Sequence, residues 1–259
     1  MNSFRITVLG SSSGMPSPTS FCSSLLFQTE KLNFLLDCGP GASFSLLRQK
    51  IDPELIDSIF ISHCHTDHIG GLFLLVQMMH LLKRKRPLNV YLPEEAISGV
   101  RNYLNTCYLF PERIMPRLVF HEVTSDFKFE DGGVSIRIHP NRHLMGNESV
   151  IRELNCPNKM QSFCYVMDIS GKRIVYSGDI QSSDDLVNIV SDADLLISEC
   201  FHVTVDELLA LAIEKNIKSV LLTHIPPELE GKEQEILQRA RKLGFEKLTL
   251  AHDGLVIEA

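Results

Sequence analysis

A six-residue run of metal-binding side chains constrains the fold of this chain more than any other feature. Residues 63–68 read His-Cys-His-Thr-Asp-His, directly after an apolar segment and before a second one. Neutral imidazole and carboxylate groups are ligands for zinc and related divalent ions. In a loop, His63 and His65 can converge on one ion, while Asp67 and His68, near the start of a helix, can face a second. The run therefore predicts a metal-binding loop between a strand and a helix.

Short β-rich segments alternate with amphipathic ones along the whole chain, which predicts an α/β fold with a sheet-rich core covered by helices. No linker, low-complexity tract or block of charge divides the sequence, so we expect one domain over residues 1–259. The expected strands are 5–9, 24–28, 33–37, 58–62, 89–92, 118–123, 134–139, 162–168, 173–177, 195–199, 219–223, 247–251 and 255–258. The expected helices are 42–50, 71–85, 94–105, 205–215 and 232–242.

The pattern His-x-His-x-Asp-His after an apolar strand resembles the signature of the metallo-β-lactamase-like hydrolases. Three later motifs follow in the order of that family: His143 closes residues 138–143, Asp179 ends Tyr-Ser-Gly-Asp, and His224 ends Leu-Leu-Thr-His. His139 is a rival for the position of His143, which we prefer. The resemblance implies a four-layer αββα sandwich.

The same resemblance implies two divalent metal ions, with zinc as the expected metal and manganese, iron or cobalt as alternatives. Asp179 would lie between the ions. The ligands of one ion would be His63, His65 and His143, and those of the other Asp67, His68 and His224.

Three features resemble the branch of tRNase Z and bacterial cyclic phosphodiesterases. Residues 9–16, Leu-Gly-Ser-Ser-Ser-Gly-Met-Pro, resemble its opening Gly/Ser loop, and residues 251–254 resemble its Ala-x-Asp-Gly ending. His202, 22 residues before His224, resembles the extra histidine that donates a proton to the departing oxygen. An imidazole suits this work because its pKa lies near neutrality. Glu199 is a candidate to orient it, and Asp253 a candidate turn or supporting residue.

Two features argue against a full tRNA substrate. Only 36 positions separate His143 from Asp179, which leaves no room for the long basic arm of true tRNase Z. The formal net charge is −7, from 25 Lys and Arg against 32 Asp and Glu, whereas tRNA binding draws affinity from cations. The basic run 83–86, Lys-Arg-Lys-Arg, has two readings: it complements a helix dipole, or it recruits phosphate.

We therefore expect a dinuclear-metal-dependent phosphodiesterase that uses hydroxide held at the metals. Asp67 would hold a metal and orient the nucleophile, and His202 would assist the leaving alcohol. The expected substrate is a small or flexible phosphodiester: a cyclic nucleotide, a cyclic phosphoribosyl compound or an RNA 3′ end. The alternatives are a lactone or thioester hydrolase on the same centre, a tRNA 3′-processing endoribonuclease, and a non-catalytic metal or nucleotide sensor.

The ends and the cysteines predict a cytoplasmic protein that does not engage a membrane. The N-terminal apolar run is too short for a signal peptide, and the segment 70–82 is too short to span a bilayer. The seven cysteines form no Cys-x-x-Cys pair, as expected for reduced thiols. A homodimer is expected by analogy with the family branch.

Overall fold

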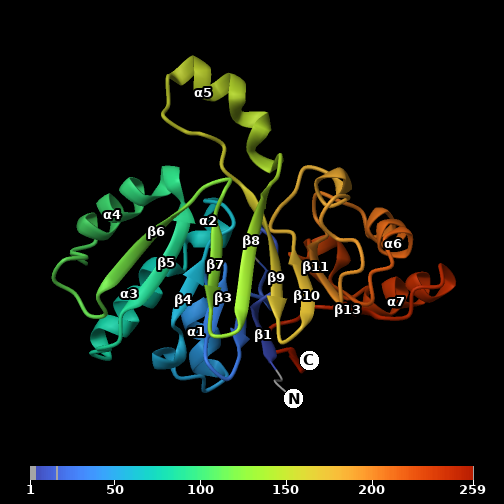
Figure 1. Cartoon of the computed structure of the whole chain (residues 1–259), viewed down its shortest axis with the longest axis horizontal. Coiled ribbons are helices and arrows are strands. Elements are labelled where there is room, and N and C mark those ends of the chain that lie inside the picture. Colours follow the sequence, from blue (N-terminus) through green and yellow to red (C-terminus); the bar gives the residue numbers. More distant parts are fainter. Residues whose placement is uncertain (1–3, 16, 259) are drawn as a thin grey trace.

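A computed structural model describes residues 4–15 and 17–258, and its core is a pair of mixed seven-stranded sheets (Figure 1). The first sheet is antiparallel from β14 to β3 and parallel from β3 to β6. In spatial order its strands are β14 (Val256–Glu258), β1 (Arg5–Gly10), β2 (Ser24–Gln28), β3 (Asn33–Leu36), β4 (Ser58–Phe60), β5 (Leu88–Pro93) and β6 (Leu118–Val123). Pro16, the last residue of the predicted Gly/Ser loop, lies outside the described residues.

The second sheet repeats this mixture of directions. It is parallel from β13 to β10 and antiparallel from β10 to β7. In spatial order its strands are β13 (Leu248–Leu250), β12 (Val220–Thr223), β11 (Leu195–Glu199), β10 (Lys172–Tyr176), β9 (Phe163–Ile169), β8 (Val134–Pro140) and β7 (Lys128–Asp131). Because β9 runs antiparallel to both of its neighbours, β8 runs in the same direction as β10, β11 and β12.

Three apolar clusters separate four layers. The central cluster lies between the sheets and is rich in aromatic side chains, such as the stacked rings of Phe60 and Tyr91 at 4.3 Å. A second cluster joins the first sheet to α1 (Ala42–Arg48), α3 (Leu72–Leu81) and α4 (Ile97–Thr106). The third joins the second sheet to α6 (Val205–Glu214) and α7 (Glu233–Lys242). The predicted αββα sandwich is confirmed.

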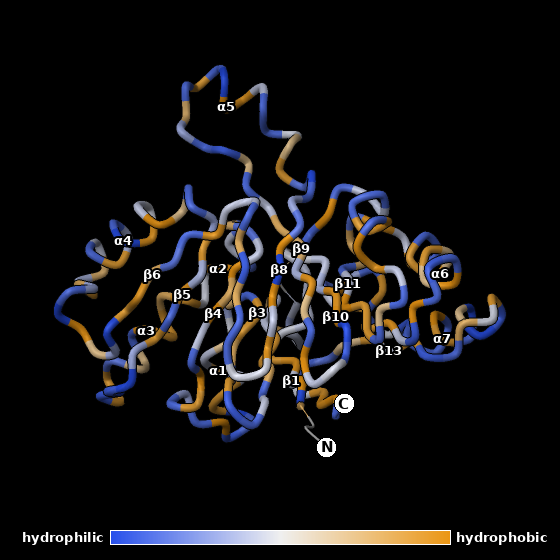
Figure 2. The backbone as a smooth tube through the Cα atoms, viewed as in Figure 1, coloured by the Kyte–Doolittle hydropathy of each residue, from blue (hydrophilic) through white to orange (hydrophobic). Residues whose placement is uncertain are grey.

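The apolar patterns of the sequence did not predict two elements, β7 and α5. Strand β7 reads Lys-Phe-Glu-Asp at a sheet edge, where exposed charged residues replace the alternation of a half-buried strand. Helix α5 (Glu148–Leu154) has no buried residue, and it stands away from the sandwich (Figure 1, Figure 2). Val150 and Leu154 on it are exposed.

The predicted helix 71–85 was too long at its end. Helix α3 ends at Leu81, and Lys83 takes a left-handed conformation with φ of 57°. This reversal lets Arg84 turn inward, where it is 1% exposed and donates to the carbonyl oxygens of Pro53 at 2.7 Å and Ile56 at 2.6 Å. The two interpretations of the basic run, that it complements a helix dipole or recruits phosphate, are therefore wrong for Arg84. Its guanidinium group instead stabilises the neighbouring backbone.

The remaining differences are small. The predicted helix 94–105 divides into a 3₁₀ turn, η2 (Glu94–Ala96), and α4. A one-turn helix, α2 (Thr66–Ile69), was not predicted separately. Among the described residues, none of the helices combines the length and apolarity that crossing a bilayer requires.

Candidate metal centre

The metal-ligand candidates collect where strands of both sheets end. His63 and His65 lie in the loop after β4, and Asp67 and His68 lie in the single turn of α2 that follows. From the second sheet, His143 follows β8, Asp179 follows β10, and His224 follows β12 directly. Since β8, β10 and β12 run in the same direction, their carboxyl ends meet at one edge, as is common for sites in α/β folds.

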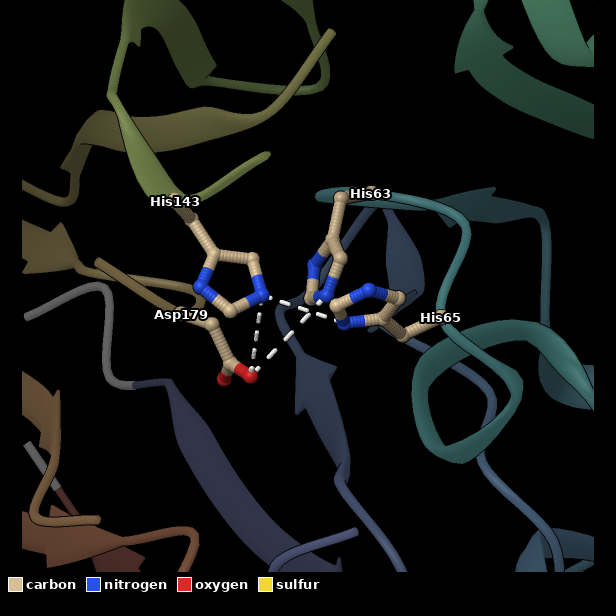
Figure 3. A group of neighbouring side chains, drawn as sticks. All are labelled: His63, His65, His143 and Asp179. Atoms are coloured by element: carbon tan, nitrogen blue, oxygen red, sulfur yellow. Dashed lines mark hydrogen bonds and ion pairs between the residues drawn. The ribbon is translucent and has the colours of Figure 1, made fainter. Parts of the chain in front are cut away.

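The first group consists of His63, His65, His143 and Asp179, whose ligand-type atoms all lie within 4.8 Å of one another (Figure 3). His143 Nε2 is 3.0 Å from His65 Nδ1. Asp179 Oδ2 is 3.7 Å from His143 Nε2 and 3.9 Å from His63 Nε2. Three imidazole nitrogens thus converge beside one carboxylate.

The second group consists of Asp67, His68, His224 and again Asp179, within the same spread of 4.8 Å. His224 Nε2 lies 3.1 Å from Asp67 Oδ2, and His68 Nε2 lies 3.2 Å from Asp179 Oδ1. Asp179 therefore contacts both groups, and the two sets of ligand candidates share this one carboxylate.

The unpartnered atoms of these groups suit a divalent cation. His63 Nε2 is buried and has no hydrogen-bond partner, and the buried atoms His68 Nε2 and Asp179 Oδ1 lie 3.2 Å apart without the geometry of a hydrogen bond. Leaving such atoms unpaired costs about 1–3 kcal/mol each, so buried polar groups in native proteins are usually satisfied. The donor set of imidazole nitrogen and carboxylate oxygen is that of zinc and related divalent ions. The residues present therefore fit a divalent metal centre.

The protonation states of His63, His143 and Asp179 agree with ligand chemistry. Burial holds the pKa of His63 well below its ordinary value and lowers the pKa of His143 to about 4, which favours neutral imidazoles. Burial opposes ionisation of Asp179, but the imidazoles of His68 and His224 more than offset it, so its pKa lies well below the usual range. A metal site needs neutral imidazole and ionised carboxylate. His68 differs: burial opposes its protonation, but the carboxylates of Asp179 and Asp37 more than offset this and hold its pKa well above the ordinary value, so an ion bound there would displace a proton.

Asp37 is a central residue that sequence reasoning missed. Its Oδ2 accepts from His68 Nδ1 at 2.7 Å, from the Tyr176 hydroxyl at 2.6 Å and from the Ser62 hydroxyl at 2.9 Å. The Ser62 oxygen in turn accepts from His63 Nδ1 at 3.1 Å. Both histidines are thereby set with their protons on Nδ1 and their Nε2 lone pairs toward the two groups.

The sequence did carry a signal for Asp37. The strand prediction 33–37 treated it as the last strand residue, but β3 ends at Leu36 and Asp37 has a positive φ of 57°. An acidic residue in this conformation, next to the Cys-Gly-Pro-Gly turn that follows, is typical of a functional strand end.

His202 lies beside both groups and is oriented by Glu199. Its Nδ1 is 3.0 Å from Glu199 Oε1, and its ring centroid is 4.8 Å from that of His143. The hydrogen bond to Glu199 raises the pKa of His202. Glu199 is 1% exposed, and its Oε2 accepts from the backbone N–H groups of Phe201 at 2.7 Å and His202 at 2.8 Å. The predicted Glu199–His202 contact is present.

The Gly/Ser loop and the Asp-Gly ending support the centre from the first sheet. Asp253 accepts from the Ser11 N–H at 3.1 Å and from the Phe21 N–H at 2.8 Å, which ties the loop to the chain before β14. A Cβ added at Gly14 would lie 3.0 Å from Asp67 Oδ2. Glycine at this position therefore leaves the Asp67 carboxylate its space.

The other histidines have contacts of their own. His139, the rival of His143, lies within β8 opposite Cys164 and belongs to neither group. His80 Nδ1 accepts from the Met115 N–H, and His121 Nε2 contacts Asn89 Oδ1.

This sandwich and this site define a protein of the metallo-β-lactamase fold. The metallo-β-lactamase fold protein YhfI of Bacillus subtilis superposes with a TM-score of 0.79 at 23% identity, over 100% of both chains. The short form of human tRNase Z superposes with a TM-score of 0.75 at 22% identity, over 98% of each.

Residues 4–247 match the family model described as anti-Pycsar protein Apyc1, and the chain belongs to that family. A curated relative named Ribonuclease Z, from Archaeoglobus fulgidus, is 28% identical over 98% of this chain and 97% of its own length. Their alignment spans 299 positions, which exceeds the 259 residues here, so that relative carries segments without a counterpart in this chain.

Proposed function

We propose that this protein is a dinuclear-metal-dependent hydrolase that cleaves a small or flexible phosphodiester. The observation that carries the proposal is the Glu199–His202 pair, which lies beside the two groups of ligand candidates and ligates neither. The names of the relatives, tRNase Z and Ribonuclease Z, support phosphodiester cleavage as the reaction class.

The two groups would each hold one divalent ion, zinc in the first instance and manganese or iron otherwise. Such ions lower the pKa of water toward neutrality and withdraw charge from a phosphoryl oxygen. His63, His65 and His143 would hold one ion, and Asp67, His68 and His224 the other, with Asp179 shared between them. Because both sheets contribute ligands, we propose that the chain, residues 1–259, works as one domain.

The side chains around the ions divide the remaining work. Asp67, whose carboxylate is partly exposed, would hold one ion and orient the nucleophilic water. His202 holds a proton on Nδ1 for Glu199, so its Nε2 is the atom that would donate a proton to the departing oxygen. General acid catalysis of this kind contributes about 10²–10⁴-fold. Asp37 would keep the imidazoles of His63 and His68 in the required tautomer.

The substrate is proposed to be smaller than a precursor tRNA. The segment between His143 and Asp179 holds a 3₁₀ turn, the short helix α5 and two strands. The net charge of −7 gives a polyanion little general attraction. A cyclic nucleotide, a cyclic phosphoribosyl compound or a short RNA 3′ end fits these limits. The relative named Ribonuclease Z keeps tRNA 3′ processing as the second candidate.

Metal content and turnover, measured on the same preparations, test the proposal. The substrates are bis(p-nitrophenyl) phosphate, a set of cyclic nucleotides, a precursor tRNA and a lactone. We expect turnover of the small phosphodiesters, at least a thousandfold loss in Asp179→Asn, and no change in Asp168→Asn, an exposed acid on β9. A metal-loaded protein that leaves every phosphodiester intact, or prefers the lactone, contradicts the proposal.

A homodimer is proposed as the working assembly. Phe44 and Leu47 on α1 are 58% and 60% exposed, and large apolar side chains exposed together are common at interfaces. Sedimentation should show a dimer for the wild type and a weaker dimer for Leu47→Lys.

A further inference from the structure

Asp185 is a buried acidic residue that belongs neither to the two ligand groups nor to the proposed catalytic residues. It ends the 3₁₀ turn η4 (Ser183–Asp185). Its side chain is only 5% exposed, whereas that of the neighbouring Asp184 is 79% exposed. Aspartate is almost never buried to this extent unless its carboxylate is paired. The partners of Asp185 therefore show what its burial achieves.

The first partner of Asp185 is Arg142, which directly precedes the ligand candidate His143. Asp185 Oδ1 accepts from Arg142 Nε at 2.8 Å, and its Oδ2 accepts from the backbone N–H of Arg142 at 3.4 Å. The guanidinium group also donates to the Ser182 hydroxyl at 3.1 Å. Bonds between an ionised donor and an ionised acceptor are the stronger kind in proteins. Arg142 is thus held through its side chain and through its backbone.

The second partner of Asp185 lies in the loop that carries the ligand candidate Asp179. Gln181, two residues after Asp179, donates its backbone N–H to Asp185 Oδ2 at 2.9 Å. A single carboxylate therefore accepts from the loop after β10, which holds Asp179, and from the loop after β8, which holds His143. The two loops come from strands that are separated in the sheet by β9.

Contacts at the base of a projecting segment determine where His143 lies. His143 begins the 3₁₀ turn η3 (His143–Asn147), which leads into α5, a helix with no buried residue. The backbone N–H of His143 donates to Asn141 Oδ1 at 3.1 Å. Asn141 is buried, and its own N–H donates to the carbonyl oxygen of Ser162 at 2.9 Å. The residues just before His143 therefore anchor it, and Arg142 is one of them.

We propose that Asp185 is a positioning residue of the metal centre, which sets His143 against Asp179 by joining the two loops that carry them. Asp179 Oδ2 lies 3.7 Å from His143 Nε2, and a shift of either loop would change this distance. Metal affinity depends on the residues that hold the ligands in place. Asp185 acts through Arg142 and the N–H of Gln181. The inference rests on the proposed function, because it assumes that the ligand groups bind metal.

Asp184 provides a matched control for a metal titration. Its Oδ2 lies 3.8 Å from Arg142 Nη2, so Asp184→Asn removes the same charge beside the same arginine without altering the bonds that join the loops. In competition titrations between zinc and a chelator, we expect Asp185→Asn to lower zinc affinity about 10–100-fold. Asp184→Asn should stay within about threefold of the wild type. Wild-type affinity in Asp185→Asn, or an equal loss in both variants, overturns the inference.

A variant of Arg142 tests the connection from its other end. Arg142→Ala removes an exposed side chain, so it carries the same test if Asp185→Asn does not fold, which circular dichroism would show. Both substitutions break one connection, so the loss of zinc affinity in the double variant should be smaller than the product of the two single losses. Single losses that multiply in full would show that Asp185 does not act through Arg142.

NMR of the metal-free protein measures the position of His143 directly. The ring centroids of His65 and His143 are 4.8 Å apart, so we expect a nuclear Overhauser effect between their carbon-bound protons in the wild type. It should persist in Asp184→Asn and weaken in Asp185→Asn. A residue that contributes only to overall stability would leave this signal unchanged in the folded protein. An unchanged signal in Asp185→Asn therefore overturns the inference.

The outcomes separate the two proposals. A weakened signal in Asp185→Asn, together with a wild type that binds no divalent ion, contradicts the proposed function and leaves the role of Asp185 in placing His143 standing. Phosphodiester hydrolysis by the wild type, together with unchanged zinc affinity and an unchanged signal in Asp185→Asn, contradicts this inference and leaves the proposed function standing.

Discussion

The carboxylate of Asp37 lies 2.7 Å from Nδ1 of His68, although neither the sequence motif nor the ligand groups include Asp37. Both side chains are buried, at 0% exposure. The same oxygen accepts from Tyr176 and, through Ser62, influences His63. One carboxylate thus sets the orientation of an imidazole in each group, which makes it a positioning residue for the whole centre.

Replacing Asp37 should weaken metal binding while leaving every ligand candidate in place. Removing a residue that orients a metal ligand commonly costs 10–100-fold in affinity. We expect Asp37→Asn to show a loss of that order in a competition titration with a chelator. Asp168→Asn is the control, since its carboxylate pairs with Arg137 at the surface. Unchanged affinity in Asp37→Asn would contradict the positioning role.

His202 should matter most where the leaving group is a poor one. An alkoxide needs a proton as it departs, whereas p-nitrophenolate leaves without help. We expect His202→Asn to lower kcat about 10²–10⁴-fold on a cyclic nucleotide and less than tenfold on bis(p-nitrophenyl) phosphate. A uniform loss on both substrates would instead indicate damage to the metal centre, which metal analysis of the same samples would reveal.

The pH profile of kcat should report on Glu199. The hydrogen bond from His202 to Glu199 raises the pKa of His202, and general acid catalysis needs the protonated imidazole. Activity is therefore retained below this pKa and lost as pH rises through it. Glu199→Gln lowers the pKa of His202, so the descending limb of its profile should move to lower pH. A profile that stays in place in Glu199→Gln would contradict this assignment.

Metal removal should lower thermal stability. Any ligand that binds only the folded state stabilises it by mass action, by about 2.7 kcal/mol at a concentration of one hundred times its Kd. We expect a chelator to lower the Tm of the wild type and added zinc to restore it. Asp179→Asn, which removes the shared carboxylate, should show little response to zinc. An equal zinc response in both proteins would place the ion elsewhere.

Substitutions in the basic run 83–86 should show that the buried Arg84 stabilises the fold and that the exposed Lys85 does not. Arg84 donates to two buried backbone oxygens, those of Pro53 and Ile56, and each acceptor left unpaired costs about 1–3 kcal/mol. We expect Arg84→Met to lower the free energy of unfolding by about 3 kcal/mol in urea titrations. Lys85→Ala, at an exposed neighbour, should change it by less than about 0.5 kcal/mol. If Lys85→Ala instead reduces the affinity for substrate, the interpretation that the exposed lysines recruit phosphate would be supported.

The predictable parts of this molecule are those with a strong local pattern. Apolar runs predict most strands, and the dense motif around His63 predicts the loop after β4. Asp179 and His224 could be proposed because the motifs that contain them resemble those of the metallo-β-lactamase-like hydrolases. That these residues bind metal stays a prediction.

The unpredicted parts depend on contacts distant in the sequence. Asp37 is separated by 31 positions from His68 and by 139 from Tyr176, so its role appears only when three strand ends meet. Arg84 reads as one more surface charge until the turn at Lys83 directs it inward. The exposed helix α5 carries no core-facing pattern, because it packs no buried side chain against the sandwich.

The sharing of Asp179 has a thermodynamic consequence. An ion in one group would change the charge and the orientation of a carboxylate that the other group also uses, so the two occupancies are linked. This linkage is reciprocal. If binding of the first ion changes the affinity for the second by some factor, binding of the second changes the affinity for the first by the same factor. Binding curves for the pair would therefore not separate into two independent sites.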